Sequence, residues 1–331
     1  MKSIPALRVA LTSQCNLNCE YCPPGGENFF NVRKPLGTKR LLRILKVFHE
    51  IGFRQFGFTG GEPLLNKNIL TISKECSRLK GTFLKLYTNG ILLKSKIGLL
   101  KGINLIKLSL DTVNLKKYKE ITGRDKLRDV LEGIDAARKN RLKVRINAVL
   151  TKKNYGEVLS LINFCCNKRI DLKILDLNCF DLPGYLAWRN IYKSTAVVVN
   201  HLVKENFDKA IIHTVGNYGI PMSEFKLDGI SIRIKNSKNS STYSPVCRDC
   251  KYFLCQEGLY QLTLTSDGRI KMCWHRPDIN ADLSLISEPE IKRTILHFLE
   301  KHYFSAERVF TQKQVFLGCF GTKGGHERKK N

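Results

Sequence analysis

The chain has 331 residues, 43% of them hydrophobic, which is enough for one large domain and a smaller one with ordinary buried cores. No run of 18 or more apolar residues occurs, and the first residues lack the features of a secretory signal, so we expect a cytoplasmic protein without a membrane span. Lysine and arginine outnumber aspartate and glutamate 56 to 29, and this net charge of +27 favours anionic partners. Because the basic residues are spread over the whole length, nucleic acid is not the expected partner.

Six short runs rich in β-formers recur in the first half of the chain, at residues 7–12, 54–60, 83–88, 105–110, 143–150 and 172–177. Stretches with apolar residues at helical spacing lie between them, such as TKRLLRILKVFHEIG and LRDVLEGIDAARKNRL. This alternation predicts parallel strands joined by helical crossovers. The fold class is therefore α/β, with a partial (β/α)6 barrel of the TIM type.

The regular alternation ends after residue 178, which suggests three parts. The partial barrel is expected over residues 1–180. A connecting segment, 181–246, contains a predicted helix at 194–209 and a predicted hairpin near 224–236. A smaller C-terminal domain, 247–331, begins with a second group of cysteines, CRDCKYFLC.

The chain has twelve cysteines, and three of them lie together in QCNLNCEYC, on the loop that follows the first predicted strand. In a reducing cytosol such thiols are more naturally metal ligands or catalytic groups than disulfides. Their spacing is C-x3-C-x2-C, with Cys15, Cys19 and Cys22. Structural zinc needs a fourth ligand, whereas three thiolates suit a 4Fe–4S cluster with one free iron. A zinc loop or a chance grouping is the alternative.

Polar and glycine-rich residues follow the other predicted strands, in TGGEP (59–63), YTNG (87–90) and SLD (109–111). In parallel barrels, ligands bind at the carboxyl ends of the strands, so these residues are expected to converge on one mouth. The glycines allow close approach of the backbone, and Glu62 offers a carboxylate to a cationic group. Taken alone, each motif would be an ordinary turn.

The cysteine spacing with Tyr21 as the aromatic residue resembles the radical S-adenosylmethionine (SAM) superfamily. The resemblance implies that Cys15, Cys19 and Cys22 hold a 4Fe–4S cluster whose free iron chelates SAM. An electron then cleaves SAM to methionine and a 5′-deoxyadenosyl radical, which abstracts hydrogen from a substrate. A low-potential donor such as flavodoxin or ferredoxin would supply the electron. The implied SAM-binding residues are Tyr21, Gly60, Gly61, Glu62, Thr88, Ser109 and Asn147, with Glu62 in the motif that receives the ammonium group of SAM.

Over residues 7–150 the resemblance narrows to the MoaA family, the GTP 3′,8-cyclases of molybdenum cofactor biosynthesis, especially in LRVALTSQCNLNCEYC, FGFTGGEPLL and ITGRD. It implies basic residues that grip a triphosphate, and Arg8 and Lys173 match two of them. Where two basic pairs are expected, however, this chain has Gln55 with Gly57 and Gln261 with Thr263. Four cationic contacts are therefore missing, each typically contributing about 1.5–3 kcal/mol.

The MoaA resemblance also implies a second cluster, held in that family by C-x2-C-x13-C. Only Cys273 matches here. LTLTSDGRIKMC is similar to the hairpin of the SPASM and twitch auxiliary-cluster domains, and its DG dipeptide predicts the turn. A second 4Fe–4S cluster is expected, with zinc as the alternative. Its four favoured ligands are Cys247, Cys250, Cys255 and Cys273, and Cys319 is a further candidate. The role of Gly324 and Gly325 stays open.

The sequence thus predicts a MoaA-like radical SAM enzyme that acts on an unidentified small molecule, nucleotide or peptide. A first alternative is a GTP 3′,8-cyclase, which would be favoured if Arg8 and Lys173 faced a pocket ringed by other lysines and if the second cluster had an open iron. A second alternative is a non-catalytic metal-binding or nucleic-acid-binding protein.

Overall fold

The computed structural model describes residues 4–22, 34–178, 185–213, 217–236, 241–250, 255, 258–259, 261–273, 275–276 and 278–309. In this part of the chain, no helix is both long and apolar enough to cross a bilayer. The ten cysteines within it are all free thiols.

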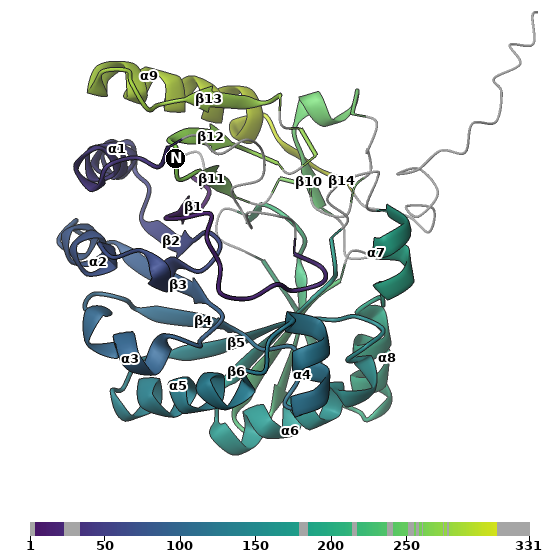
Figure 1. Ribbon diagram of the computed structural model, residues 1–331. Coiled ribbons are helices and arrows are strands. Elements are labelled where there is room, and N and C mark those ends of the chain that lie inside the picture. The colour runs from purple at the N-terminus through teal and green to yellow at the C-terminus, as the bar shows by residue number, and fades with distance from the viewer. Residues whose placement is uncertain are drawn as a thin grey trace, which may run out of the picture.

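A single twelve-stranded sheet forms the centre of the molecule (Figure 1), in the order β13-β12-β11-β1-β2-β3-β4-β5-β6-β9-β8-β7. The strands are β1 (Leu7–Ala10), β2 (Gln55–Thr59), β3 (Phe83–Thr88), β4 (Leu105–Ser109), β5 (Val144–Val149), β6 (Asp171–Leu175), β7 (Lys209–Ile212), β8 (Met222–Leu227), β9 (Ile230–Lys235), β11 (Leu262–Leu264), β12 (Arg269–Lys271) and β13 (Asn280–Asp282). A separate antiparallel pair joins β10 (Ser241–Tyr243) to β14 (Glu307–Val309).

All six strands predicted for the barrel are present, and β1 to β6 are parallel neighbours. The sheet then continues past them at both edges, because β9 pairs in parallel with β6 and β11 pairs in parallel with β1. Antiparallel strands end the sheet on each side, so the barrel stays open. The predicted partial barrel is confirmed.

The sheet crosses both domain boundaries drawn from the sequence. The hairpin expected near 224–236 is β8 with β9, and the TSDG turn joins β11 to β12, where Gly268 has φ of +94°. Both hairpins extend the barrel wall instead of forming a separate layer. The division at residues 180 and 246 therefore remains a prediction.

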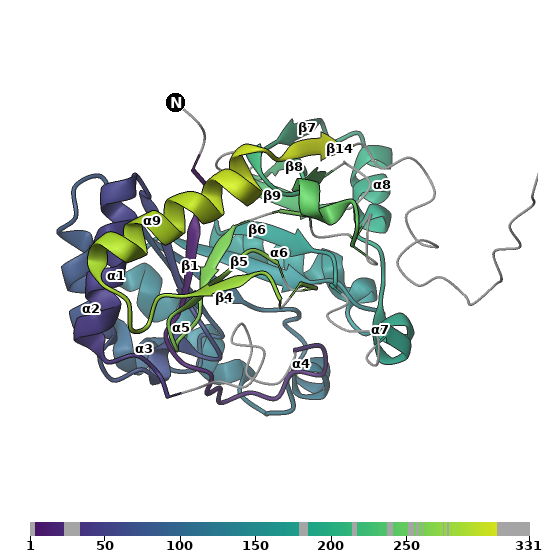
Figure 2. The ribbon, with the colours of Figure 1, turned by 90° about the horizontal axis from the view of Figure 1, so that it is seen from above.

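The helices cover the outer face of the curved sheet, as the view from above shows (Figure 2). They are α1 (Thr38–Ile51), α2 (Ile69–Ser77), α3 (Leu93–Lys96), α4 (Leu115–Thr122), α5 (Leu127–Lys139), α6 (Val158–Lys168), α7 (Tyr185–Ile191), α8 (Ala196–Lys204) and α9 (Glu288–Leu299). Helix α1 packs on the sheet because one of its faces is apolar. That face consists of residues at helical spacing that are buried against the strands: Leu41, Ile44, Leu45 and Phe48. The core thus lies between helices and sheet, and the concave face is left for ligands.

The C-terminal segment is fastened to the barrel through the first helix. Helix α9 packs beside α1, and the Arg40 guanidinium donates to the carbonyl oxygens of Ser284 (3.0 Å), Leu283 (2.6 Å) and Ile286. One charged side chain therefore satisfies three carbonyl groups of the turn between β13 and α9.

We predict that Arg40→Ala lowers the free energy of unfolding by about 2 kcal/mol, because charged hydrogen bonds to partly buried carbonyls are lost together. Arg43→Ala is the matched control on the same helix, since Arg43 makes only an exposed pair with Glu288 at 4.0 Å and should cost less than about 0.5 kcal/mol. Urea unfolding of both variants measures the difference. Equal costs would contradict the role assigned to Arg40.

Candidate active site

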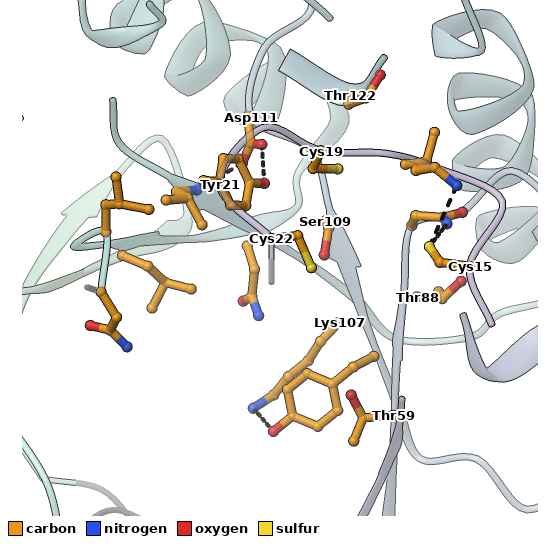
Figure 3. Close-up of a pocket in the computed structure, with 18 of the residues that line it drawn as sticks. Cys15, Cys19, Tyr21, Cys22, Thr59, Thr88, Lys107, Ser109, Asp111 and Thr122 are labelled. Atoms are coloured by element: carbon orange, nitrogen blue, oxygen red, sulfur yellow. Dashed lines mark hydrogen bonds between the residues drawn. The ribbon is translucent and has the colours of Figure 1, made fainter. Parts of the chain in front are cut away.

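A cavity of about 330 Å³ opens at the carboxyl ends of the parallel strands (Figure 3). Most of the residues predicted for the site line it, although they come from different strands and loops. These are Arg8, Cys15, Cys19, Tyr21, Cys22, Gly60, Gly61, Thr88, Ser109, Asn147 and Lys173. The fold thus gathers the sequence motifs into one place. We call this the upper cavity.

The cysteine loop is held in place by its backbone. On one side it runs along the turn after β2, where Gly61 N–H donates to Thr12 (2.9 Å) and Glu62 N–H donates to Gln14 (2.7 Å). On the other side it runs along the end of α4, where Asn18 N–H donates to the carbonyl of Thr122 at 3.0 Å. These main-chain bonds hold the loop on two sides.

The two glycines of TGGEP are needed for this contact. A Cβ at Gly60 would lie 2.2 Å from the carbonyl oxygen of Thr12, and one at Gly61 would lie 2.1 Å from that of Gln14. Gly60 also has φ of +139°, which side chains disfavour. The turn approaches the backbone of the cysteine loop as closely as glycine allows.

The three thiols face the cavity and influence one another. Burial raises the pKa of Cys22 to about 11, with a smaller contribution from Cys15, and burial also raises the pKa of Cys15 and Cys19. Thiols with raised pKa values need a cation to become thiolates, and iron supplies it on binding. No group of three His, Cys, Asp or Glu side chains in the described ranges is tight enough for a single metal ion. A four-iron cluster would place each thiolate on its own iron.

Tyr21 anchors the loop to the sheet. Its half-buried phenol donates a 2.5 Å hydrogen bond to Asp111, which lies two residues after β4 and also accepts from the N–H of Val149. Burial raises the pKa of Asp111 to about 6, and the two hydrogen bonds partly offset that rise. Asp111 lines the upper cavity but was not predicted as a site residue.

Glu62 lies beneath the cavity and does not line it. Its side chain is 0% exposed, and its two oxygens accept from Leu64 N–H (2.9 Å), Thr88 Oγ1 (2.8 Å) and Asn89 N–H (2.8 Å). The carboxylate therefore positions the residues that end β3. Its predicted contact with the ammonium group of SAM stays a prediction.

The side-chain oxygen of Asn147 indicates whether the cavity suits SAM. It projects from β5 into the upper cavity, and its Oδ1 is buried without a hydrogen-bond partner in the described part of the chain. A buried amide oxygen without a partner is costly, so the site is built for a ligand that donates a hydrogen bond there. The hydroxyl and amino groups of SAM are such donors.

The second cysteine group is also gathered by the fold. Burial raises the pKa of Cys273 to about 12, and the neighbouring Cys247 and Cys250 add to the rise. Burial raises the pKa of the Tyr303 phenol, and charge on Cys273 and Cys247 adds to the rise. The phenol oxygen has no hydrogen-bond partner in the described residues. Cys255 lies in a short described stretch, where its Sγ accepts from Gly258 N–H at 3.4 Å. Cys319, Gly324 and Gly325 lie outside the described residues.

A second cavity of about 450 Å³ lies nearer the amino ends of the strands, and we call it the lower cavity. It shares four residues with the upper cavity and is lined by six lysine and arginine side chains. The shared residues are Arg8, Tyr87, Lys107 and Lys173, and the six cations are Arg8, Lys85, Lys107, Arg145, Lys173 and Arg233. The barrel interior is therefore strongly basic.

Two features describe the charge balance of this basic cavity within the described residues. Its one acidic lining residue, Glu224, already accepts from Arg233 at 2.8 Å and from Ser231. Arg145 donates to Asp171 at 3.2 Å, yet its Nε is buried without a hydrogen-bond partner among the described residues. Burial is also the main reason that the pKa of Arg145 is lowered.

The sequence analysis missed Asp111, Asn89, Tyr87, Lys107 and Lys85. Asp111 and Asn89 stand inside motifs that were quoted, so the signal existed, but each was attributed to a turn. Lys85 and Lys107 alternate with apolar residues on β3 and β4, and a strand pattern does not tell a barrel interior from solvent.

Comparison with known proteins identifies the chain further. A model of the radical SAM superfamily matches residues 9–165. A probable GTP 3′,8-cyclase of Sulfurisphaera tokodaii is 30% identical, with 85% of each chain covered. The GTP 3′,8-cyclase of Clostridium perfringens strain 13 is also 30% identical, over 97% of this chain and 98% of the relative.

Among solved structures, Streptococcus suis SuiB bound to S-adenosylmethionine matches with a TM-score of 0.57 and 22% identity. This match covers 82% of the present chain but only 60% of SuiB. Native anSMEcpe with bound AdoMet matches with a TM-score of 0.55 and 16% identity, over 87% of this chain and 80% of that one. At these identities the likeness shows the fold.

The open parallel barrel and its cysteine-lined cavity, together with these matches, define a radical SAM enzyme, a class that uses a 4Fe–4S cluster and SAM. The expected cofactors and enzymatic nature are thereby confirmed, and the non-catalytic alternative has no support from the relatives. Within the superfamily, the chain belongs to the MoaA family, to which the GTP 3′,8-cyclases belong.

We predict that Gly61→Ala lowers the iron content of the purified protein by about half, because a Cβ there collides with the carbonyl of Gln14 and must displace the cysteine loop. Gly98→Ala is the control, since a Cβ at Gly98 meets nothing within 4 Å. Iron and sulfide are counted after anaerobic reconstitution. Full iron in Gly61→Ala would show that the close approach is dispensable.

Glu62 predicts a pH dependence of stability. Burial raises its pKa to about 7, from a usual value of 4.5. Between these values the unfolded chain releases the proton first, so the folded state binds more protons and the free energy of unfolding falls as pH rises. The contribution of Glu62 to the fall should reach up to about 3 kcal/mol. Glu62→Gln should remove this contribution and leave that of Asp111, whose pKa is raised to about 6.

Urea unfolding of metal-free, reduced protein at several pH values between about 4.5 and 8 tests this prediction. The exposed Glu75, paired with Arg78 on α2, gives the control variant Glu75→Gln, which should keep the wild-type pH slope. An unchanged slope in Glu62→Gln would mean that the carboxylate is ionised in the folded state throughout this range.

Proposed function

We propose that Cys15, Cys19 and Cys22 hold the 4Fe–4S cluster and that SAM occupies the upper cavity, with the substrate entering from the lower cavity. The observation that carries this proposal is that the three thiols, the glycine turn, Thr88, Ser109 and Asn147 rim one cavity at the carboxyl ends of parallel strands. When bound, the cluster and SAM supply a 5′-deoxyadenosyl radical that abstracts a hydrogen atom from the substrate.

The chain's own residues position the cysteine loop and SAM and limit the access of water. The backbone bonds to the turn after β2 and to α4 fix the cysteine loop, and Tyr21 ties it to Asp111. Glu62 holds Thr88 and the N–H of Asn89 from beneath, so the end of β3 faces SAM in one orientation. The amide of Asn147 would accept a hydrogen bond from SAM. SAM and substrate bound inside the barrel would leave little room for water beside a reactive radical.

For the second metal site we propose a 4Fe–4S cluster with ligands from Cys247, Cys250, Cys255 and Cys273. Three of these thiols influence one another, and the phenol of Tyr303 beside them is buried without a partner among the described residues. A cluster sulfur would accept its hydrogen bond. The electron donor we propose is a low-potential protein such as flavodoxin or ferredoxin, in the cytoplasm.

A specific observation favours the GTP 3′,8-cyclase alternative. The basic pairs that the family resemblance led us to expect at 55 and 57 and at 261 and 263 are missing, but Arg8 and Lys173 do face a cavity ringed by other cations. Lys85, Arg145 and Arg233 lie on β3, β5 and β9 and offer replacements. A nucleoside triphosphate is therefore a substrate that this lumen could hold.

The first experiment is anaerobic reconstitution followed by assay of 5′-deoxyadenosine release from SAM under dithionite. We expect about eight irons in the wild type, about four in Cys15→Ala, and no 5′-deoxyadenosine from that variant. Cys166→Ala is the matched control, because Cys166 lies on α6 away from both cavities. The enzyme proposal fails if wild-type protein with full iron never cleaves SAM.

The nucleotide alternative has its own test. We predict that Lys85→Ala weakens GTP binding by roughly tenfold, since one charged contact contributes about 1.5–3 kcal/mol, while SAM binding stays within about twofold. Lys80→Ala, on the loop before β3, is the control. Anaerobic equilibrium dialysis measures both ligands, and nucleotide products are analysed after turnover. GTP that neither binds nor reacts would leave a different substrate for the same radical chemistry.

A further inference from the structure

Tyr87 stands where the two cavities meet. It lies on β3, directly before Thr88, and lines both the upper and the lower cavity. Its neighbours at this junction are Arg8, Lys107 and Lys173, the other residues that line both. Lys107 and Thr59 mark this end of the upper cavity in Figure 3, on the side away from the cysteines. A ligand that spans both cavities would therefore lie against these four residues, Tyr87 among them.

The tyrosine ring occupies space left open by a glycine on the next strand. A Cβ at Gly57 would lie 2.7 Å from Cε2 of Tyr87. Gly57 is paired with Arg8 on β1 and with Lys85 on β3, so the ring leans across β2 towards β1. Gly57 and Tyr87 therefore act as a pair: the absence of a side chain at one position admits the ring at the other.

Cations hold the ring in this position. The guanidinium carbon of Arg8 lies 4.4 Å from the ring centroid, and the Lys107 ammonium lies 4.7 Å from it and donates to the phenol oxygen at 3.0 Å. Arg8 is itself fixed by Gln261, whose amide oxygen, oriented towards it, accepts at 2.9 and 3.0 Å. The ring is thus part of a built surface formed by β1, β3, β4 and the residue that precedes β11.

The volumes of the two cavities indicate where a second ligand would lie when SAM is bound. A ligand pocket commonly measures about 300–1,000 Å³, so an upper cavity of about 330 Å³ holds one ligand of moderate size. With SAM there, most of a second ligand has to lie in the lower cavity of about 450 Å³. The reacting part of that ligand must still approach SAM, which brings it against Tyr87.

We propose that Tyr87, seated over Gly57, is a specificity-determining residue of the substrate site. The proposal rests on the proposed function and names the substrate class as a nucleoside polyphosphate. Its anionic end lies among Lys85, Arg145 and Arg233, and its nucleoside part packs against the Tyr87 ring and faces SAM. The ring then fixes how far the nucleotide rises towards the radical, and Gly57 fixes the ring.

The test uses reconstituted full-length enzyme and the variants Tyr87→Ala, Gly57→Ala and the double variant. We expect each single substitution to weaken GTP binding about tenfold and to leave SAM binding within about twofold of wild type. Because both act through one contact, the double variant should bind GTP no more weakly than Tyr87→Ala alone. Inorganic tripolyphosphate, which needs only the lower cavity, should bind equally to all four proteins. Tyr155→Ala removes a tyrosine outside both cavities and is the matched control.

Several results would overturn the inference. GTP affinity within twofold of wild type in Tyr87→Ala would do so, and so would additive losses in the double variant or an equal loss of SAM affinity. If Tyr87→Ala does not fold, Gly57→Ala decides alone, because it displaces only the far edge of one ring. Wild-type enzyme that cleaves SAM but does not bind GTP sinks this inference and leaves the radical enzyme intact. Absence of SAM cleavage sinks the proposed function itself.

Discussion

The site depends on the backbone contact between the cysteine loop and the turn after β2. Two N–H groups of that turn donate to carbonyl oxygens of the loop, at an approach that only glycine permits. Below this contact, the carboxylate of Glu62 accepts from three groups and fixes the start of the next loop. Main-chain bonds and a buried carboxylate thus set the position of the thiols before any iron arrives, and such preorganisation lowers the cost of binding.

The rest of the lumen is organised by strand alternation. On the parallel strands the helix-facing residues are apolar and buried, while the lumen-facing ones include Arg8, Lys107, Asn147 and Lys173. Polar groups inside a barrel are costly unless a ligand or another side chain satisfies them. The basic lower cavity and the buried amide of Asn147 are therefore tolerated as parts of a binding site, whereas a purely structural barrel would fill the same positions with apolar side chains.

The sequence predicts the features that depend on local pattern. The six strands, the cysteine loop and the glycine turn follow from periodicity and spacing, and the structure places them together. What the sequence does not reveal are side-chain directions and distant partners. The burial of the Glu62 carboxylate below the cavity could not be read from its motif, and its contact with SAM stays a prediction. Asp111 was passed over because its partner, Tyr21, is far away in the chain. The pairing of β11 with β1 left no local signature, so the C-terminal strands were assigned to a separate domain.

That pairing has a consequence for how the molecule assembles. Strand β1 has β2 on one side and β11 on the other, with Leu7 beside Leu262, so one of the first strands to be synthesised gains its second neighbour among the last. Contacts between residues so distant in the chain form slowly, because a long loop must close first. Until then, one edge of the nascent barrel has unpaired backbone groups beside reactive thiols. The protein is therefore most exposed to aggregation and oxidation late in its own synthesis, when it already has its cysteine loop but not yet its complete wall.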